Sequence, residues 1–547
     1  MHKKVLSFIN REISGLHQAA YLLAGFSLLS QVLALVRDRL LAASFGASTS
    51  LDIYYAAFRI PDFIFITVGS MVSVSVLIPF LMSKMKDSPA EGKRFIGNVF
   101  VFFFSCIVVV CGIAFVYMRE LNTLIFPGFS PDTLAEVVVL SRILLLSPIL
   151  LGLSNIFGTL TQAYQRFFVY ALSPILYNLS IIFGILVLYP QFGLVGLVYG
   201  VALGALLHAA IQVPFIVTHK LIPRISGRIN FRELREVFIV SVPRTFTLGS
   251  DSISVMFLLS FASLMASGSI AIFQFSYNLQ SVPLSMIGVS YSVAAFPLLI
   301  KFWNDKQHTA FIDQTILSAK HIIFWSIPIS TLLVVLREPI VRVILGAGRF
   351  GLADMRLTAA ALALFAFSVV FQNLTLLFVR AYYATGNTVK PFIAKFCNAT
   401  STIVFGYFFM TLFTTNPSFR DGLEWFLNVQ HVPGTIILAL PLGWSVGEIL
   451  NTIILWLVFE RDFSKFSLPV LTTTFQVIVA SCGSALVASS ILEITFNPLI
   501  NTTLSQVFMQ GFSAGIAGIL SGVAILLLFK NEEFLHVCAG VHQRFAR

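Results

Sequence analysis

Long apolar stretches recur along the whole chain, and they constrain its fold more than any other feature. Each covers about 20 residues, the length that an α-helix needs to cross a bilayer. Backbone groups in lipid must be hydrogen-bonded within their own segment, and no alternating strand pattern is present, so helices are expected. We count about fourteen spans, at residues 18–45, 52–82, 95–118, 134–163, 168–190, 193–218, 236–265, 268–300, 311–336, 357–384, 388–414, 433–459, 468–493 and 507–529. The sequence therefore predicts an all-α polytopic membrane protein.

The composition narrows the function classes. Of the 547 residues, 57% are hydrophobic and 11% are charged, whereas about 25% of residues are charged in soluble domains. The loops between the spans are too short for a catalytic domain, which excludes a soluble enzyme. None of the five cysteines forms a CxxC motif or a cluster of zinc spacing. We expect no metal and no cofactor; a coupling cation and the membrane potential both remain open as driving forces.

The placement of the positive charges predicts the topology. With the N-terminus inside, most of the Lys and Arg residues outside the spans fall on cytoplasmic loops, as the positive-inside rule requires. The net charge of +11 then reflects topology and anionic lipid, and no nucleic-acid partner is needed. Both termini are expected to be cytoplasmic. One loop disagrees, because on the predicted outer side it carries Arg337, Arg342, Arg349 and Arg356.

A weak internal repeat indicates two related lobes. Gln162-Ala163-Tyr164 ends one predicted span and Pro174 lies in the next; Arg380-Ala381-Tyr382 ends a later span, and Pro391 opens the next. Two related bundles around a central cavity are a common transporter plan. The expected parts are an interfacial amphipathic segment (1–16), an N-terminal lobe of six helices (17–220), a basic cytoplasmic linker (221–235), a C-terminal lobe of five helices (236–415), three further helices (416–530) and a cytoplasmic tail (531–547).

Several motifs resemble one known family. The segment 30–61 reads SQVLALVRDRLLAASFGASTSLDIYYAAFRIP, and in order there follow QAYQRFFVYALSPILYNLSII, GLVYGVALGALLHAAIQVP, VPRTFTLGS, NLQSVPLSMIGVSYSVAAFP and RAYYATGNTVKP. These resemble the MurJ/MviN family of lipid II flippases in the MOP transporter superfamily, over about residues 15–400. The resemblance implies a bacterial inner-membrane flippase for the undecaprenyl-pyrophosphate-linked peptidoglycan precursor. It also implies membrane lipids and cell-wall synthesis proteins as partners.

Charged side chains within the spans are the candidate substrate-binding residues, because a buried charge in a membrane usually pairs or lines a wet cavity. Arg37 and Asp38 close the first span, either as an interfacial ion pair or with Arg37 gripping a pyrophosphate oxygen. Arg59 lies just before Pro61, which should kink the helix, and it could bind a ligand or snorkel to the surface.

The other candidates also carry two interpretations each. Asp52 could cap the second span or act in gating. Arg244, behind Pro243, could contact the substrate or pair with Asp251, which we assign to gating. Asn278 is a candidate substrate contact, although uncharged amides in such helices more often bond neighbouring helices.

Several functions therefore compete. The leading hypothesis is a lipid II flippase that works by alternating access. The family pattern places positive charges where this chain has Gln31, Phe65, Ile66 and Asn278, so a flippase for another lipid-linked oligosaccharide, or a scaffold that does not transport, stays open. A cationic-drug exporter would favour acidic residues in the cavity, and a membrane enzyme would need paired carboxylates or a metal site.

Overall fold

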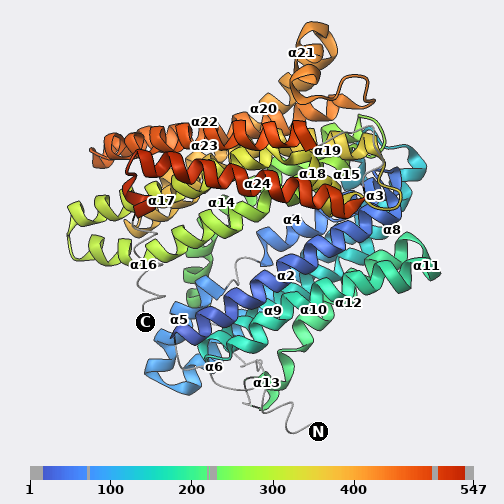
Figure 1. Ribbon diagram of the computed structural model, residues 1–547. Coiled ribbons are helices and arrows are strands. Elements are labelled where there is room, and N and C mark those ends of the chain that lie inside the picture. The colour runs from blue at the N-terminus through green and yellow to red at the C-terminus, as the bar shows by residue number, and fades with distance from the viewer. Residues whose placement is uncertain (1–15, 70–73, 219–220, 222–230, 496–502, 536–547) are drawn as a thin grey trace. The chain divides into compact units, whose positions relative to one another are not determined.

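The computed structural model describes residues 16–69, 74–218, 221, 231–495 and 503–535. Within these ranges every regular element is a helix, which confirms the all-α prediction (Figure 1). All but the last residue of the predicted interfacial segment (1–16), most of the basic linker (221–235) and most of the tail (531–547) lie outside the described residues.

Twelve helices in the described ranges are long and apolar enough to cross a membrane. They correspond to the predicted spans from 95–118 onward. The predicted span 18–45 corresponds to one continuous helix, α2 (Leu16–Phe45). The predicted span 52–82 is divided among α3 (Thr49–Ala57), α4 (Arg59–Thr67) and α5 (Val74–Asp87). The protein is thus a multi-pass membrane protein, and the count of fourteen spans remains a prediction.

Polar residues at the predicted helix starts explain several boundaries. The Ser88 hydroxyl accepts the backbone N–H of Glu91 at the start of α6 (Pro89–Val116), and Ser130 does the same for Thr133 at α8 (Pro131–Leu144). Thr503 caps α24 (Leu504–Leu528) through Gln506. Each cap satisfies one of the N–H groups that a helix leaves unpaired at its first turn.

Contacts divide the chain into two compact units, Met1–Ile270 (the N-terminal unit) and Ala271–Arg547 (the C-terminal unit). Helix α14 (Phe231–Ser263) packs on α4 and therefore belongs to the N-terminal unit by contact. The sequence placed this helix with the second lobe, on the basis of span order. The lobe boundaries read from the sequence remain a proposal about the repeat.

The N-terminal unit is built around α2, α9, α10 and α12. In Figure 1 these helices run alongside one another, with α10 packed between α2 and α12. Its other elements complete the bundle and its ends. The elements after α5 are α6, α7 (Met118–Ile125), α8, α9 (Leu146–Ala163), α10 (Phe167–Phe183), η2 (Gly184–Leu188), α11 (Tyr189–Phe192), α12 (Leu194–Ala210), α13 (Val213–Thr218) and α14.

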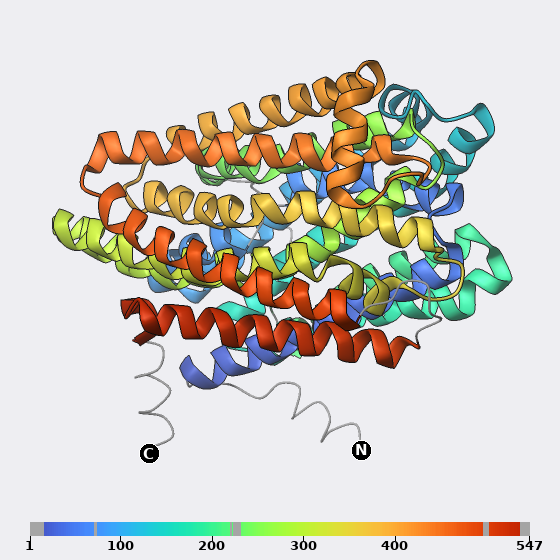
Figure 2. The same cartoon turned by 45° about the horizontal axis from the view of Figure 1, so that its top comes forward.

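The C-terminal unit is built around α19, the most buried of the spanning helices. Helix α19 packs against α16, α17, α18 and α22, and α20 lies along α22 (Figure 2). The elements are α15 (Ser269–Pro283), η3 (Leu284–Val289), α16 (Ser290–Asn304), α17 (His308–Val335), α18 (Arg337–Leu345), α19 (Leu352–Ala384), α20 (Val389–Thr415), α21 (Pro417–Leu427), η4 (Thr435–Leu438), α22 (Ala439–Phe463), α23 (Ser467–Thr495) and α24.

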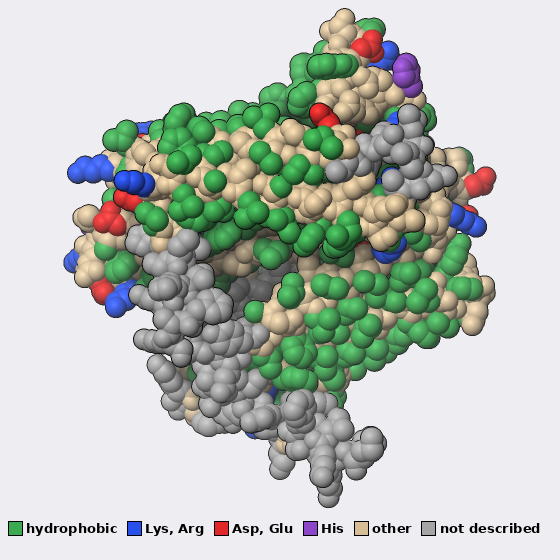
Figure 3. All heavy atoms as spheres, viewed as in Figure 1, with side chains coloured by type: hydrophobic (Ala, Val, Ile, Leu, Met, Phe, Trp, Pro, Cys, Tyr) green, Lys and Arg blue, Asp and Glu red, His purple; other side chains and the backbone are tan. Residues whose placement is uncertain are grey.

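The outer surface of each unit fits a lipid environment. Apolar side chains cover the sides of the helices, and most of the charged side chains visible in Figure 3 lie near helix ends. Large apolar residues such as Leu468, Leu520 and Leu528 are mostly exposed. A soluble protein would bury such a continuous apolar surface, so this pattern supports the membrane assignment.

One arginine of the exceptional loop 337–356 is bound by the protein. Arg337 donates from Nη1 to the Val334 carbonyl at 2.8 Å, in the last turn of α17, and from Nη2 to the Leu427 carbonyl at 3.4 Å. Burial lowers the pKa of Arg337, and the neighbouring Glu338 opposes that shift. This charge caps a helix C-terminus, which is a structural reason for an arginine on either side of a membrane.

Candidate functional site

Arg37 of α2 is held by two partners in the N-terminal unit. Its Nε and Nη2 atoms donate to Asp38 Oδ1 at 3.0 and 2.8 Å, and its Nη1 donates to Asn178 Oδ1 at 3.3 Å. The Asp38 side chain is 5% exposed, whereas that of Arg37 is 22% exposed. The predicted ion pair is therefore present, and its basic partner is the more accessible one.

The guanidinium of Arg37 has donors to spare. An arginine carries five N–H groups, and the described residues accept three of them. One N–H on Nη1 and one on Nη2 remain for another acceptor. A guanidinium presents such donors in a fixed plane that matches two oxygens of a phosphate or carboxylate group. The ion pair thus orients Arg37 without using all of its binding capacity.

Asn178 of α10 completes this arrangement, and the sequence analysis did not identify it. Its amide Nδ2 donates to the Ser30 hydroxyl at 3.2 Å and to the Pro174 carbonyl at 3.2 Å, which turns Oδ1 toward Arg37. The available signal was a single amide in an apolar helix, one turn after an internal proline. Such amides commonly bond neighbouring helices in membranes.

Arg59 lies at a break between two short helices. Because Pro61 has no N–H, the carbonyl of Ala57 loses its helical donor, and α3 ends at that residue. The helix is therefore interrupted at Phe58, three residues before Pro61. Arg59 Nε donates to the Tyr55 carbonyl at 3.2 Å. Asp62, one turn further on α4, was not identified from the sequence.

Tyr55 brings the two arginine regions together. Its backbone carbonyl accepts the Nε–H of Arg59 at 3.2 Å, and Tyr55 itself lies on α3. Helices α2 and α3 are also in direct contact. Three of the predicted substrate-binding residues therefore share one region of the N-terminal unit.

Asp52 connects α3 to the segment that follows α14. Its Oδ2 accepts the backbone N–H of Gly268 at 2.6 Å, and the hydroxyls of Thr49 and Ser267 lie 2.6 Å apart. The N-cap of α3 is Ser48, so Asp52 lies within the first turn. Gly268 has φ +88° and lies against Ala47, where a side chain would not fit. This contact fastens the α14–α15 connection to the end of α2 and the start of α3.

The remaining predicted residues lie elsewhere. Arg244 and Asp251 are both on α14; the Arg244 side chain is outside the described residues, and Asp251 is partly buried. Asn278 is on α15 in the C-terminal unit, where its Oδ1 accepts the Gln274 amide at 2.7 Å. Its neighbour Gln280 accepts the Gln372 amide of α19 at 3.0 Å, as expected for a polar bond between helices.

Comparison with known protein families identifies the family of this chain. A family model described as "Lipid II flippase MurJ" matches residues 41–417, more than half of the chain. The chain belongs to the MurJ family. This confirms the resemblance read from the motifs, and membership of a flippase family sets the enzyme hypothesis aside.

Relatives and solved structures agree with MurJ. Proteins named "Probable lipid II flippase MurJ" are 28% identical in Bdellovibrio bacteriovorus, over 70% of this chain and 76% of that protein, and 25% identical in Thermotoga maritima, over 77% and 84%. A solved MurJ in an inward closed conformation has a TM-score of 0.74 at 22% identity, over 95% of this chain and all of that one. A MATE transporter of the MOP superfamily has a TM-score of 0.63 at 14% identity, over 80% and 95%, so the fold is shared.

Proposed function

We propose that this protein is a lipid II flippase. It moves the undecaprenyl-pyrophosphate-linked peptidoglycan precursor from the inner to the outer leaflet by alternating access, for cell-wall synthesis. The observation that carries the proposal is the Arg37 guanidinium, which is oriented by Asp38 and Asn178 and keeps two N–H groups for an anionic head group. Family membership supplies the substrate class.

When a pyrophosphate oxygen leaves water for this region of low polarity, the two remaining N–H groups of Arg37 replace the water molecules that hydrated it. Charge-assisted hydrogen bonds of this kind are stronger than neutral ones. Asp38 balances the charge of Arg37. The anion is therefore bound mainly by directed hydrogen bonds from the guanidinium, and less by a net positive charge. A flippase needs such a moderate site, because it must release the head group on the other side.

Arg59 and Asp52 have different roles in this proposal. Arg59, at the break between α3 and α4, offers a second cationic contact beside the Tyr55 carbonyl. Asp52 acts in gating through its bond to Gly268, since breaking that bond frees the α14–α15 connection. Arg244 and Asn278 are further substrate contacts, and Asp251 is a further gating residue.

The proposed setting is the bacterial inner membrane, with both termini in the cytoplasm. The isoprenoid tail stays among membrane lipids, and cell-wall synthesis proteins are the expected partners. A second candidate is a flippase for another lipid-linked oligosaccharide. The observation that favours it is the presence of Gln31, Phe65 and Ile66 where the family pattern has positive charges.

A depletion and rescue assay tests the proposal. Cells that lack their own lipid II flippase receive the parent chain, Arg37→Ala, Arg37→Lys or Arg244→Ala, and outer-leaflet lipid II is quantified. Rescue by the parent and failure of Arg37→Ala at equal membrane expression supports the cargo and the anion site. Rescue by every variant removes Arg37 from the site. Failure of the parent chain removes lipid II as the cargo.

A further inference from the structure

Helix α21 (Pro417–Leu427) lies across the direction of the spanning helices of the C-terminal unit. It follows α20 directly and leads into η4 and α22, and in Figures 1 and 2 it projects sideways from those helices. Its 11 residues extend about 16 Å, whereas the apolar core of a bilayer is about 30 Å thick. Helix α21 is therefore too short to cross a membrane, and it lies either along the membrane surface or in water.

The length of α20 places the start of α21 among the lipid head groups. From Lys390 to Thr415, α20 rises about 38 Å, and a typical tilt of about 20° reduces this to about 35 Å. A bilayer with its head groups is about 40–45 Å thick. A lysine near a helix end extends toward the interface, so Lys390 marks one interface and Thr415 lies near the other. Asn416, the next residue, caps α21 by accepting the Phe419 N–H at 3.1 Å.

Helix α22 gives the same height from the other end of α21. From Ala439 to Arg461, α22 rises about 33 Å, and Arg461 lies in its last turn. Helix α20 lies along α22, so the two spans cover the same depth of the membrane. The connection between them, which contains α21, therefore leaves and re-enters the apolar core at one interface.

The inner face of α21 is bound to the C-terminal unit. The Phe419 ring stacks on Phe409 and meets Phe413 edge-on, each with ring centroids 6.1 Å apart. Glu424 Oε1 accepts the Thr435 hydroxyl of η4 at 2.6 Å. These contacts hold one face of α21 against the protein, so the direction of its opposite face is defined.

The outward face of α21 presents two neighbouring aromatic rings. Trp425 and Phe426 are 71% and 58% exposed. Gly422 lies three and four residues before them, on the same side of the helix, and nothing lies within 4 Å of a Cβ added there. Trp is enriched at membrane–water interfaces, where its ring has one apolar side and one polar N–H group.

This face continues a surface that already meets lipid. On α20, Val404, Tyr407 and Phe408 are 57%, 58% and 49% exposed, and Phe408 lies about two turns before the end of that helix. In Figure 3 the projection that α21 forms carries both apolar and charged side chains. Aromatic residues beside charged ones on a short helix are typical of helices that lie in the membrane interface.

We propose that α21 is an interfacial membrane helix whose Trp425 and Phe426 side chains bind among the lipid head groups and the first part of the acyl chains. The helix thereby holds the α20–α22 pair at a fixed depth. On the proposed topology the lipid belongs to the outer leaflet. The family match ends at residue 417, where α21 begins, so this contact is an addition to the matched segment. The inference does not depend on the cargo.

The charges of α21 indicate which lipids it binds. Its ionisable residues are Arg420, Asp421 and Glu424, one basic and two acidic, so its net charge is −1. Arg420 Nε also donates to Asp421 Oδ1 at 3.2 Å. Attraction to anionic head groups therefore contributes little, and the aromatic rings provide the binding. Vesicles of the zwitterionic lipid phosphatidylcholine are expected to suffice.

Tryptophan fluorescence tests the position of this face. The full chain is reconstituted in phosphatidylcholine vesicles whose acyl chains carry bromine either near the head group or near the terminal methyl. Emission of the parent is compared with that of Trp425→Phe, so that the difference reports Trp425. Trp325→Phe is the matched control, because Trp325 is 38% exposed near the middle of α17.

We expect bromine near the head group to remove most of the Trp425 emission, and bromine near the terminal methyl to remove much less. The Trp325 emission should show the reverse order. Aqueous iodide should quench Trp425 weakly. Strong quenching by iodide with no effect of either brominated lipid would place α21 in water and overturn the proposal. The exposed rings would then fit a protein partner.

Spin labels provide a second measurement that keeps both aromatic rings. With the five native cysteines replaced by serine, a label is attached at Gly422→Cys or at Asp421→Cys. Gly422 lies beside both rings, whereas the Asp421 side chain is 65% exposed and contacts Arg420. We expect the label at 422 to collide more with oxygen dissolved in lipid, and the label at 421 to collide more with a water-soluble nickel chelate. Equal, high access of the nickel chelate to both labels would overturn the proposal.

Discussion

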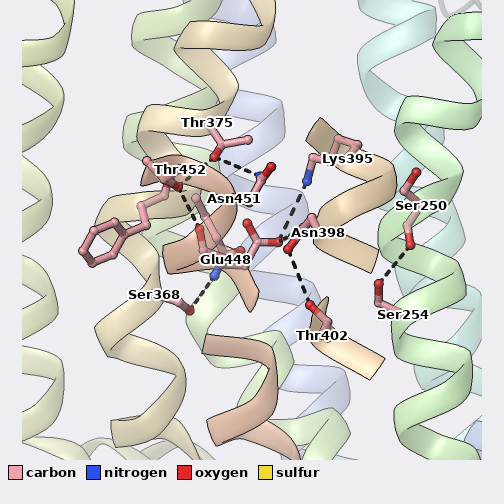
Figure 4. Close-up of polar contacts among 12 residues, drawn as sticks. Ser250, Ser254, Ser368, Thr375, Lys395, Asn398, Thr402, Glu448, Asn451 and Thr452 are labelled. Atoms are coloured by element: carbon pink, nitrogen blue, oxygen red, sulfur yellow. Dashed lines mark hydrogen bonds and ion pairs between the residues drawn. The ribbon is translucent and has the colours of Figure 1, made fainter. Parts of the chain in front are cut away.

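The N-terminal and C-terminal units each contain a buried acidic side chain beside a basic one, but the two pairs are held differently. In the N-terminal unit, Arg37 contacts Asp38 at 2.8 Å and is 22% exposed; in the C-terminal unit, Lys395 lies 3.9 Å from Glu448 and is 9% exposed (Figure 4). The first pair is direct and open to a further acceptor. The second has a longer separation and is more deeply buried.

The difference between the two units can be compared at one position of the predicted repeat. Asn178 follows Pro174 by four residues on α10, and Lys395 follows Pro391 by four residues on α20. At the same step of the repeat, one unit has an amide and the other an ammonium. The amide accepts from Arg37 of another helix, whereas the ammonium itself faces a carboxylate. If the predicted repeat relates the two helices, these equivalent positions carry an amide in one unit and an ammonium in the other.

The largest expected effect comes from removing one member of the more deeply buried pair. Lys395→Met or Glu448→Gln breaks a buried ion pair, which typically costs about 3–5 kcal/mol of unfolding free energy. Lys395→Met/Glu448→Gln should cost less than the sum of the two single changes, because each single change removes the same ion pair. Thermal unfolding in detergent at pH 8 measures both. A double variant whose loss of stability equals the sum of the two single losses would show that the charges do not interact.

Arg37→Ala should act on transport more than on stability. Loss of a charge-assisted contact costs about 1.5–3 kcal/mol, which corresponds to a fall in flipping rate of roughly 10- to 100-fold. Arg37→Lys keeps the charge but loses the planar fork, so an intermediate rate is expected. The partly exposed position predicts a small change in melting temperature. A large fall in stability with normal flipping per folded molecule would assign Arg37 a structural role.

The close contact of α20 and α22 can be tested at one glycine. Gly443→Ala places a Cβ against the Gly406 backbone and should destabilise the protein by about 1–3 kcal/mol. Gly422→Ala on exposed α21 is the matched control, since nothing lies within 4 Å of its added Cβ, and no loss of stability is expected. Equal melting temperatures for the two variants would contradict the close packing of α20 and α22.

The smallest effect is expected at the Asp52 contact. Asp52→Asn keeps an oxygen for the Gly268 N–H but removes its charge, so the bond weakens by about 1 kcal/mol. If this contact acts in gating, flipping changes while the melting temperature barely moves. Cysteine accessibility of the α14–α15 connection measures its opening directly. Unchanged accessibility and flipping would leave Asp52 with a structural role.

The sequence predicted the parts of this structure that depend on local composition. Twelve spans follow from apolar runs, and the break before Pro61 follows from the missing N–H of proline. Long-range pairings were not predictable in this way. Asn178 meets Arg37 across 141 residues, and Lys395 meets Glu448 across a loop and a helix. Sequence periodicity identifies a buried polar residue but does not say which helix will face it.

The assignment of α14 illustrates a second limit. Span order predicts that it belongs to the second lobe, and this remains a prediction; by contact, α14 packs on α4 of the N-terminal unit. Order along the chain reports how helices are connected, and packing depends on side-chain shapes that only the folded chain brings together. The same reasoning applies to Asp52, whose bond to Gly268 joins residues 216 positions apart.

The most direct test of the central claim is flipping of lipid II by the purified chain in proteoliposomes. Lipid II is placed on one leaflet, and its appearance on the other is followed by an impermeant probe for the parent, Arg37→Lys and Arg37→Ala. Transfer is expected for the parent, slower transfer for Arg37→Lys, and transfer slower by roughly 10- to 100-fold for Arg37→Ala. Equal transfer by all three, or none by the folded parent, would contradict this claim.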